Sequence, residues 1–284
     1  MASNRYARQV LAFGIEGQKQ IEALRVGIVG LGGLGSHTAQ GLAYLGVRSF
    51  VLVDDDHVDT TSLNRLIAAY PADAVAEELK VDVAERQIKL INPEATVIKI
   101  ARNLRSQEAL AGLAACQVIV GCVDHDAPRL ILTELAAAYE IPLIDAATEI
   151  TMEEERIQEF GGRVVVARPG DFCLDCAQQI DMEVAKQELE SPLTREMRKA
   201  FGYGLQEHGE APSVVSLNGV IANLAVTEFL MMAAGVRDPH RHLVYYGLRG
   251  RVNVRSDQRR TDCFICGYLT GKRDAANIFR YALD

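Results

Sequence analysis

The 284 residues are enough for one large domain or two modest ones. A hydrophobic share of 49% and a charged share of 24% are typical of an ordinary globular protein. The formal net charge of −8 argues against nucleic acid as the main partner. The N-terminus has no signal-peptide core, and no uninterrupted apolar run reaches membrane-spanning length. We therefore expect neither a nucleic-acid nor a membrane partner.

Residues 25–56 organise the rest of the chain. The apolar run 26–29 predicts a buried strand, and the glycine-rich turn 30–35 follows it. An amphipathic helix is expected over roughly 36–45, and a second strand over 50–53, which ends at Asp54. The pattern is a strand, turn, helix and strand with an acid at the end of the second strand.

The spacing of Gly30, Gly32 and Gly35, with Asp54 about 20 residues further on, is typical of a dinucleotide-binding unit. Glycines let the backbone approach a phosphate, and the helix N-terminus offers free N–H groups and a positive dipole end. A carboxylate at Asp54 can accept hydrogen bonds from ribose hydroxyls. The alternative is a tight turn without a ligand, and the pattern does not specify which nucleotide binds.

Several charged residues lie near this unit in the chain. Residues 4–24 predict a helical lead-in that carries Arg8, and the polar stretch 57–65 follows the second strand and ends at Arg65. A clear amphipathic helix over 75–91 carries Lys80. Ligands of open α/β sheets lie beyond the carboxyl ends of the strands, so Arg65 is suited to meet a phosphate. Each of the three can equally be an ordinary surface charge.

Another apolar run, 117–122, predicts a strand that ends close to Asp124. A carboxylate just beyond a strand end is suited to a magnesium–phosphate site. Alternatively, Asp124 or Asp126 caps the helix expected over 127–139, where Pro128 in the first turn supports that helix start.

The second half of the chain has a different rhythm. Strands are expected over 142–146 and 163–167, and residues 177–212 are a charged, poorly patterned excursion. A strongly apolar helix spans 213–234, and a hairpin follows over 243–248 and 252–254.

Two CxxC pairs supply the candidate metal ligands, Cys173 with Cys176 and Cys263 with Cys266. Two such knuckles suit a tetrahedral four-thiolate zinc site, which has no open position and is therefore structural. A redox dithiol or disulfides are the alternatives. Cysteines arranged in pairs fit a reducing cytoplasm, and Cys116 and Cys122 are expected to be inert core residues.

An ordered set of motifs resembles a known family. The set comprises RYARQ at 5–9, GLGGLG at 30–35, DDD at 54–56, LNR at 63–65, Lys80, Asn92-Pro93, Asp124 and the paired CxxC. Nearly the whole chain, roughly 5–267, resembles the ThiF and molybdopterin-synthase adenylyltransferase family, the bacterial relatives of ubiquitin-activating enzymes.

The resemblance implies a Rossmann-like α/β fold, with a mixed, mainly parallel sheet flanked by helices. A C-terminal antiparallel extension and a four-cysteine zinc knuckle complete it. Residues 1–284 would form a single adenylation domain, with a nucleotide-binding half over 25–150 and the sheet extension, excursion and zinc site over 151–284. Such proteins use ATP and Mg²⁺ to adenylate the C-terminal carboxylate of a small ubiquitin-like or sulfur-carrier protein, and most are homodimers. The expected acceptor is a carrier that ends in Gly-Gly, or a peptide.

The family's residue roles carry over to this sequence position by position. Gly33 would touch the nucleotide, Asp54 would hold the ribose, and Asp124 would hold Mg²⁺. Arg65 and Lys80 would neutralise phosphate charge, while Arg8 would reach the partner subunit's site. The catalytic set is therefore Arg8, Arg65, Lys80 and Asp124, and the full nucleotide-contacting set is Gly30, Gly32, Gly33, Asp54, Asp56, Ser62, Asn64, Arg65, Lys80, Asp124 and His125.

Three departures from the family pattern are Ser62 and His125 at positions where Asn is usual, and Leu66 where Gln is usual. No cysteine lies between 176 and 263, so adenylation without a thioester or persulfide step is the simpler expectation. Two other functions stay open at this point. One is a non-catalytic nucleotide-binding scaffold, and the other is an NAD-dependent oxidoreductase.

Overall fold

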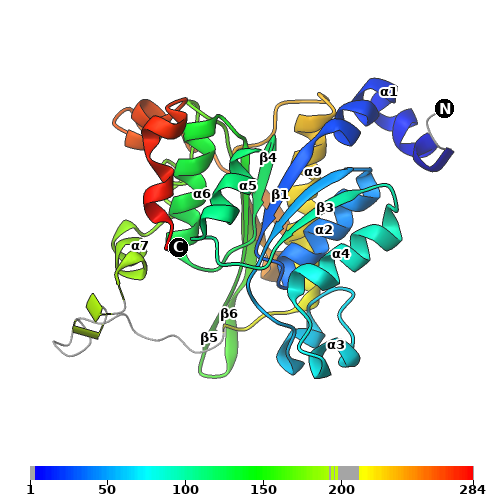
Figure 1. Ribbon diagram of the computed structural model, residues 1–284, viewed down its shortest axis with the longest axis horizontal. Helices are drawn as coiled ribbons and strands as arrows, with labels where there is room; N and C mark the ends of the chain where they lie inside the picture. Colours follow the sequence, from blue (N-terminus) through cyan, green and yellow to red (C-terminus); the bar gives the residue numbers. More distant parts are fainter. Residues whose placement is uncertain (1–3, 192, 195, 198–210, 284) are drawn as a thin grey trace.

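The computed structural model describes residues 4–191, 193–194, 196–197 and 211–283. Part of the predicted excursion over 177–212 therefore lies outside the described residues. Within them, eight strands form one sheet in the order β3-β2-β1-β4-β5-β6-β7-β8 (Figure 1). The strands are β1 (Arg25–Val29), β2 (Ser49–Val53), β3 (Thr96–Ile100), β4 (Val118–Gly121), β5 (Leu143–Glu153), β6 (Arg156–Ala167), β7 (His242–Tyr246) and β8 (Arg251–Val254).

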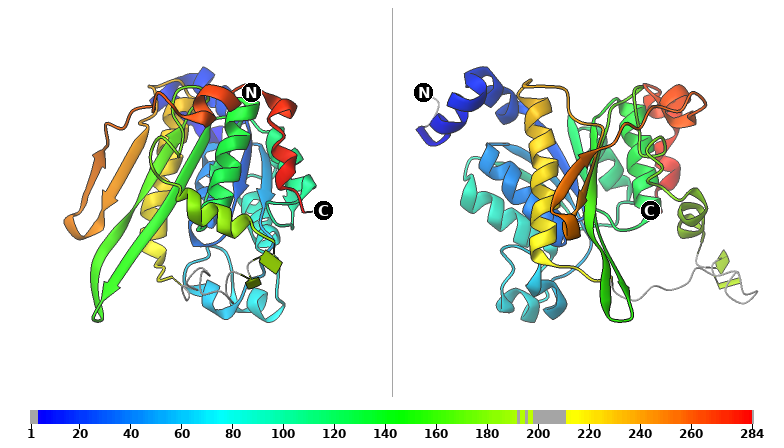
Figure 2. Two further views of the ribbon diagram at one scale, coloured as in Figure 1. Left: turned by 90° about the vertical axis from the view of Figure 1, so that its left-hand side faces the viewer. Right: turned by 180° about the vertical axis from the view of Figure 1, so that it is seen from behind.

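The first five strands are parallel, and β6 to β8 continue the same sheet in antiparallel pairing. This is the predicted mixed α/β sheet with its antiparallel extension. β5 and β6 are much longer than predicted and form a hairpin that projects beyond the body (Figure 2). A tight turn at Glu154 and Glu155, both with positive φ, joins the two strands.

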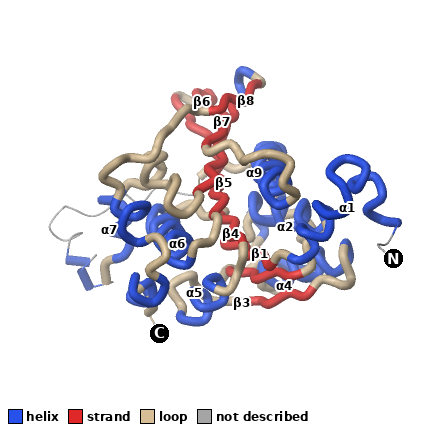
Figure 3. Tube along the Cα trace, turned by 90° about the horizontal axis from the view of Figure 1, so that it is seen from above, coloured by secondary structure: helices blue, strands red, loops and turns tan. Residues whose placement is uncertain are grey.

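Helices cover both faces of the sheet. Viewed from above, α2, α4 and α9 lie on one side and α5, α6 and α7 on the other (Figure 3). The longer helices are α1 (Ala7–Ala23), α2 (Gly33–Leu45), α4 (Lys80–Ile91), α5 (Gln107–Ala114), α6 (Asp126–Tyr139), α7 (Met182–Leu189) and α9 (Val215–Ala233), with a short α3 at Pro71–Val75. Single-turn helices occur at Asn4–Tyr6, Thr60–Asn64, Gly247–Arg249, Ile265–Leu269, Arg273–Ala276 and Ile278–Tyr281.

Two apolar layers hold the helices to the sheet. One contains Phe50, Ile88 and Phe229 under α2, α4 and α9, and the other contains Leu113 and Leu135 under α5 and α6. These side chains are fully buried, and each contributes roughly 1.5–3 kcal/mol relative to exposure. The helix α9 is long and apolar enough to cross a membrane by length and composition alone. The sequence predicted this apolar helix over 213–234, and in the structure α9 packs against α2 and the sheet.

The helix predicted over 75–91 is interrupted in the structure. Residues 71–75 form α3, and α4 begins only at Lys80. Glu77 has a positive φ, and Leu79 forms a β-bridge with His57, the residue that follows Asp54 to Asp56. The chain is thus drawn against the end of β2 before α4 starts. This interruption places Lys80 at a helix N-terminus.

Candidate nucleotide site and cysteine cluster

The parallel pairing of β1, β2 and β4 brings the predicted site residues to one edge of the sheet. Val29 is level with Val53 in β2 and with Gly121 in β4. Beyond these ends, Gly30 N–H donates to the Val53 carbonyl at 3.0 Å, and Cys122 N–H donates to the Val29 carbonyl at 2.8 Å. The glycine turn, Asp54 and the residues around Asp124 therefore meet at this edge, because the carboxyl ends of parallel strands coincide. We call this group of residues the nucleotide edge, after the ligand that the sequence predicts there.

Glycine is suited to each position of the turn for a different physical reason. Gly30 has a φ of +81°, and a Cβ on it would lie 2.6 Å from the Cys122 carbonyl oxygen. A Cβ on Gly35 would lie 1.9 Å from the Gly30 carbonyl oxygen. At Gly32, no atom of the described residues lies within 4 Å of the place a Cβ would take. This open space precedes the first free N–H groups of α2, so the turn fits a phosphate group.

Asp54 is bound by the backbone of both neighbouring turns. Its Oδ2 accepts from Leu31 N–H at 2.5 Å, and its Oδ1 accepts from Asp56 N–H at 2.9 Å. Burial raises the pKa of the Asp54 carboxyl, and the Leu31 N–H and the positive charge of Lys80 oppose that rise. Each carboxylate oxygen keeps a further lone pair, which is the acceptor that a ribose hydroxyl needs.

Lys80 lies beside the same acidic turn. Its Nζ contacts Asp56 Oδ2 at 2.6 Å, and its backbone N–H donates to the Asp56 carbonyl at 3.0 Å. The Lys80 side chain is 14% exposed and the Asp56 side chain 66%. The exposed carboxylate of Asp56 thus holds the Lys80 ammonium group near Asp54. A phosphate group could take the place of Asp56 in this contact.

The loop with Ser62 and Arg65 docks on the first turn of α2, because Ser36 Oγ accepts from Ile67 N–H at 3.0 Å. The Arg65 guanidinium donates to the Thr61 carbonyl and, at 3.2 Å, to Asn64 Oδ1. Ser62 is buried, and its hydroxyl lies 2.8 Å from Asp59 Oδ1. That hydroxyl therefore forms its hydrogen bond within the loop.

Leu66, another departure from the family pattern, packs in the interior of the same loop. It is 4% exposed and packs with Val58 and Val83 in a small separate apolar cluster. The bond from the Ser62 hydroxyl is the main reason that the pKa of Asp59 is lowered. Two of the three departures, Ser62 and Leu66, thus stabilise the loop itself.

Asp124 lies just before α6, whose N-cap is His125, and is 91% exposed. The next residue, His125, has its Nδ1 3.1 Å from Glu188 Oε1, and Glu188 Oε2 accepts from Ala127 N–H at 2.7 Å. Arg129 donates to the Val123 carbonyl at 3.1 Å. Glu188 in α7 and Arg129 in α6 therefore support the turn that carries Asp124, and sequence reasoning missed both.

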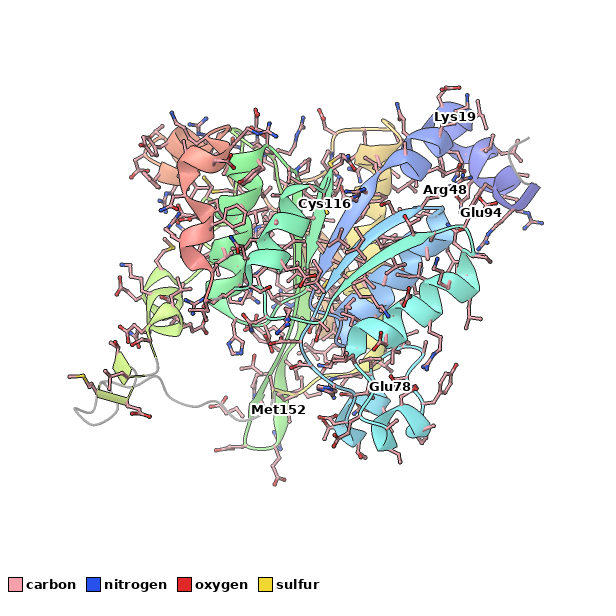
Figure 4. The ribbon with its side chains drawn as sticks, viewed as in Figure 1. Lys19, Arg48, Glu78, Glu94, Cys116 and Met152 are labelled. Atoms are coloured by element: carbon pink, nitrogen blue, oxygen red, sulfur yellow. The ribbon has the colours of Figure 1, made fainter. Side chains whose placement is uncertain are left out.

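Arg8 is not brought to this edge within one chain. It is exposed on α1, which lies at the end of the molecule opposite α3 and the β5–β6 hairpin (Figure 1). Figure 4 shows the same separation, with Lys19 of α1 at one end and Glu78 and Met152 at the other.

The four cysteines of the CxxC pairs form one buried cluster. Cys173 Sγ lies 3.7 Å from Cys176 Sγ and 3.5 Å from Cys263 Sγ, and Cys176 Sγ lies 3.8 Å from Cys266 Sγ. A tetrahedral zinc site with Zn–S bonds of about 2.3 Å would have sulfurs about 3.8 Å apart. The donor set therefore fits a structural zinc ion.

The other two cysteines have the character expected of core thiols. Burial raises the pKa of Cys116 and of Cys122 to about 12, so neither is a thiolate at neutral pH.

A cavity of about 830 Å³ opens on the α6 side of the antiparallel extension. Strands β5, β6 and β7 form its floor, residues 178–181 contribute to its wall, and Arg129 lines it near the nucleotide edge. Its volume is in the range of ligand-binding clefts. No sequence pattern pointed to it, because its walls come from segments far apart in the chain.

Comparison with known proteins gives consistent matches. The model of the ThiF family matches residues 6–268. Molybdopterin-synthase adenylyltransferase of Escherichia coli (strain K12) is 28% identical over 269 residues, covering 93% of this chain and 96% of that protein. The sulfur carrier protein ThiS adenylyltransferase of the same organism is 28% identical over 268 residues, covering 93% and 94%.

The fold also matches a solved structure. The crystal structure of E. coli MccB with ATP has a TM-score of 0.73 and 21% sequence identity, covering 94% of this chain and 75% of that one. This likeness concerns the fold alone, whereas the family match spans nearly the whole sequence. This chain therefore belongs to the ThiF family, and the full-length relatives named above are adenylyltransferases.

Proposed function

We propose that this chain uses Mg²⁺-ATP to adenylate the C-terminal carboxylate of a small ubiquitin-like or sulfur-carrier protein, or of a peptide. The observation that supports the proposal is that the Gly30–Gly35 turn, Asp54, Lys80 and Arg65 lie beyond the carboxyl ends of β1 and β2, while Asp124 follows the end of the adjacent strand β4. Membership of the ThiF family supports the same reaction. The whole of 1–284 then acts as one adenylation domain.

In the proposed reaction, a carboxylate oxygen of the acceptor attacks the α-phosphorus of ATP. The bond from that phosphorus to the bridging oxygen breaks, and pyrophosphate leaves. The attacking carboxylate is already ionised at neutral pH, so no general base is needed. The α2 N-terminus, Arg65 and Lys80 would hold the negative charge of the phosphates by fixed electrostatic contacts.

A magnesium ion held by Asp124 would add a Lewis acid at the leaving phosphates. The exposed Asp124 carboxylate, on a turn supported by Glu188 and Arg129, fits a metal that keeps most of its ligands as water and phosphate oxygens. The four-thiolate cluster would hold a separate zinc ion with a structural role.

The acceptor tail would enter through the cavity over β5 to β7. Arg129 links that cavity to the turn before Asp124, which supports this route. A carrier with a Gly-Gly C-terminus is our first candidate, and a peptide is the second.

A homodimer would supply Arg8 in trans. Leu11 on α1 is 88% exposed, and Val215 and Val220 on α9 are each 39% exposed. These apolar side chains are suited to contact a second copy. The free cysteines support a reducing compartment, for which we propose the cytoplasm.

ATP–pyrophosphate exchange tests the function. With a matching acceptor, the chain should exchange labelled pyrophosphate into ATP, and Asp124→Ala should abolish the exchange. If ATP binds but no carrier or peptide with a free C-terminus supports exchange, a non-catalytic scaffold becomes the better account. His125 stands where the family usually has Asn, and it contacts Glu188. This departure is the feature that favours the scaffold.

A further inference from the structure

The first residue of α2 is enclosed from two sides. A Cβ on Gly33 would lie 2.2 Å from Asn218 Nδ2 and 3.2 Å from Arg65 Cγ. Gly33 is therefore a glycine because Asn218 of α9 occupies the space of its side chain. Asn218 follows Gly33 by 185 positions in the sequence, and no motif pointed to it.

Asn218 is held firmly in this position. It is 2% exposed, and its Nδ2 donates to Ser213 Oγ at 3.2 Å. The next residue, Gly219, packs against His37 of α2, whose Cε1 would be 3.3 Å from a Cβ there. This close contact between α2 and α9 keeps Asn218 beside the α2 N-terminus.

The chemistry of the side chain suits this location. A carboxamide is neutral, and its nitrogen carries two N–H donors, one more than the Ser213 contact uses. It faces the positive end of α2 next to Arg65, where a phosphate is expected. A carboxylate of the same shape would bring a buried negative charge to that place, where salt screens it weakly.

We propose that Asn218 is a positioning residue of the phosphate site. It fixes Gly33 and the first turn of α2, and it keeps protein negative charge away from the N–H groups that a phosphate would use. The inference rests on the proposed function, because it requires that ATP phosphates bind at the α2 N-terminus.

The decisive variant is Asn218→Asp, with Asn223→Asp as its matched control. Asn223 lies on the exposed face of the same helix, and its Nδ2 donates to the Gly219 carbonyl at 2.7 Å. The α2 N-terminus favours an acid at this place and burial of a carboxylate opposes it, so thermal melting without ligand must first show that Asn218→Asp folds as Asn223→Asp does. By calorimetric titration, its affinity for ATP should fall by about ten-fold or more.

Adenosine separates a phosphate effect from general damage. It lacks phosphates, so its affinity should change by less than about three-fold in Asn218→Asp. ATP affinity within two-fold of that of Asn223→Asp would overturn the inference, as would an equal loss for ATP and adenosine. A wild-type chain that binds no ATP would overturn the proposed function, and this inference with it.

A second variant covers the case in which Asn218→Asp does not fold. Asn218→Ser keeps a small donor but no longer contacts Gly33, so ATP affinity should fall by roughly three- to ten-fold relative to Asn223→Ser. Unchanged ATP affinity in Asn218→Ser would contradict the positioning role.

Discussion

The cysteine cluster and the nucleotide edge are two sites of opposite design. The four cysteines are each at most 6% exposed, all come from one chain, and leave a metal no open position. At the nucleotide edge, Asp124 is 91% exposed and Asp56 66%, and Arg8 belongs to α1, which lies at the end of the molecule opposite α3 (Figure 1). A closed site stabilises a fold, whereas an open, charged site is suited to a substrate.

Loss of one of the proposed zinc ligands should give the largest effect. Cys263→Ser should remove the bound zinc and lower stability by several kcal/mol, because structural metal binding contributes directly to folding. Metal analysis and thermal unfolding measure both effects. The control is Cys116→Ala, a buried thiol outside the cluster, which should keep full zinc content. A Cys263→Ser protein with normal zinc content would show that the cluster is not the metal site.

Loss of charge at the nucleotide edge should lower activity strongly but change stability little. Lys80→Ala should lower pyrophosphate exchange by roughly 100-fold, the scale of a lost charge contact, while stability changes little. The control is Lys99→Ala, because Lys99 pairs with Asp82 and Glu85 on the sheet's β3 edge. Equal exchange rates in the two variants would remove Lys80 from the site.

Mixing two nearly inactive variants tests whether the edge is completed by a second copy. Arg8→Ala and Lys80→Ala subunits should each keep only about a hundredth of wild-type exchange alone. After exchange of subunits, half of the dimers carry one intact site, so about a quarter of wild-type activity should return. Light scattering should give the mass of a dimer. Activity no higher than that of the single variants, in mixtures that do form mixed dimers, would place Arg8 outside the partner's site.

The smallest effect should appear in the antiparallel half, where His242 is 1% exposed and its Nδ1 lies 2.5 Å from Asp257 Oδ2. Burial lowers the pKa of His242 below its ordinary value of 6.5. Its stabilising contribution is therefore present above pH 6.5 and lost as the pH falls, because the unfolded chain takes up the proton first.

His242→Gln should reduce this loss between about pH 6.5 and 5.5, by at most about 1.4 kcal/mol per pH unit. Urea unfolding at the two pH values measures it, and ATP binding at about pH 7.5 should be unchanged. A variant with the wild-type pH slope would contradict the effect of burial at His242.

Local patterns in the sequence predicted most of the scaffold. The glycine turn, Asp54 and the paired cysteines could be recognised because each depends on residues close together in the chain. The interruption before Lys80 could not, since the helical periodicity of 75–91 continues through it. The positive φ of Glu77 and the bridge to His57 are tertiary effects that override local propensity.

Contacts between distant segments account for the residues that the sequence did not reveal. Asn218 and Glu188 lie in parts of the chain with no family motif, and they reach the site only through the packing of α9 on α2 and of α7 on α6. Ser62 belongs to a recognised motif, but its bond to Asp59 depends on the local fold of the loop.

The central claim is that the nucleotide edge binds ATP together with Mg²⁺. Equilibrium titration of the wild-type chain with ATP and with NAD, each with and without Mg²⁺, tests this claim most directly. We predict that ATP binds, that Mg²⁺ strengthens this binding and Asp124→Ala removes the gain, and that NAD does not compete. Tight NAD binding, or ATP binding that is indifferent to Lys80→Ala and Asp124→Ala, would contradict this claim.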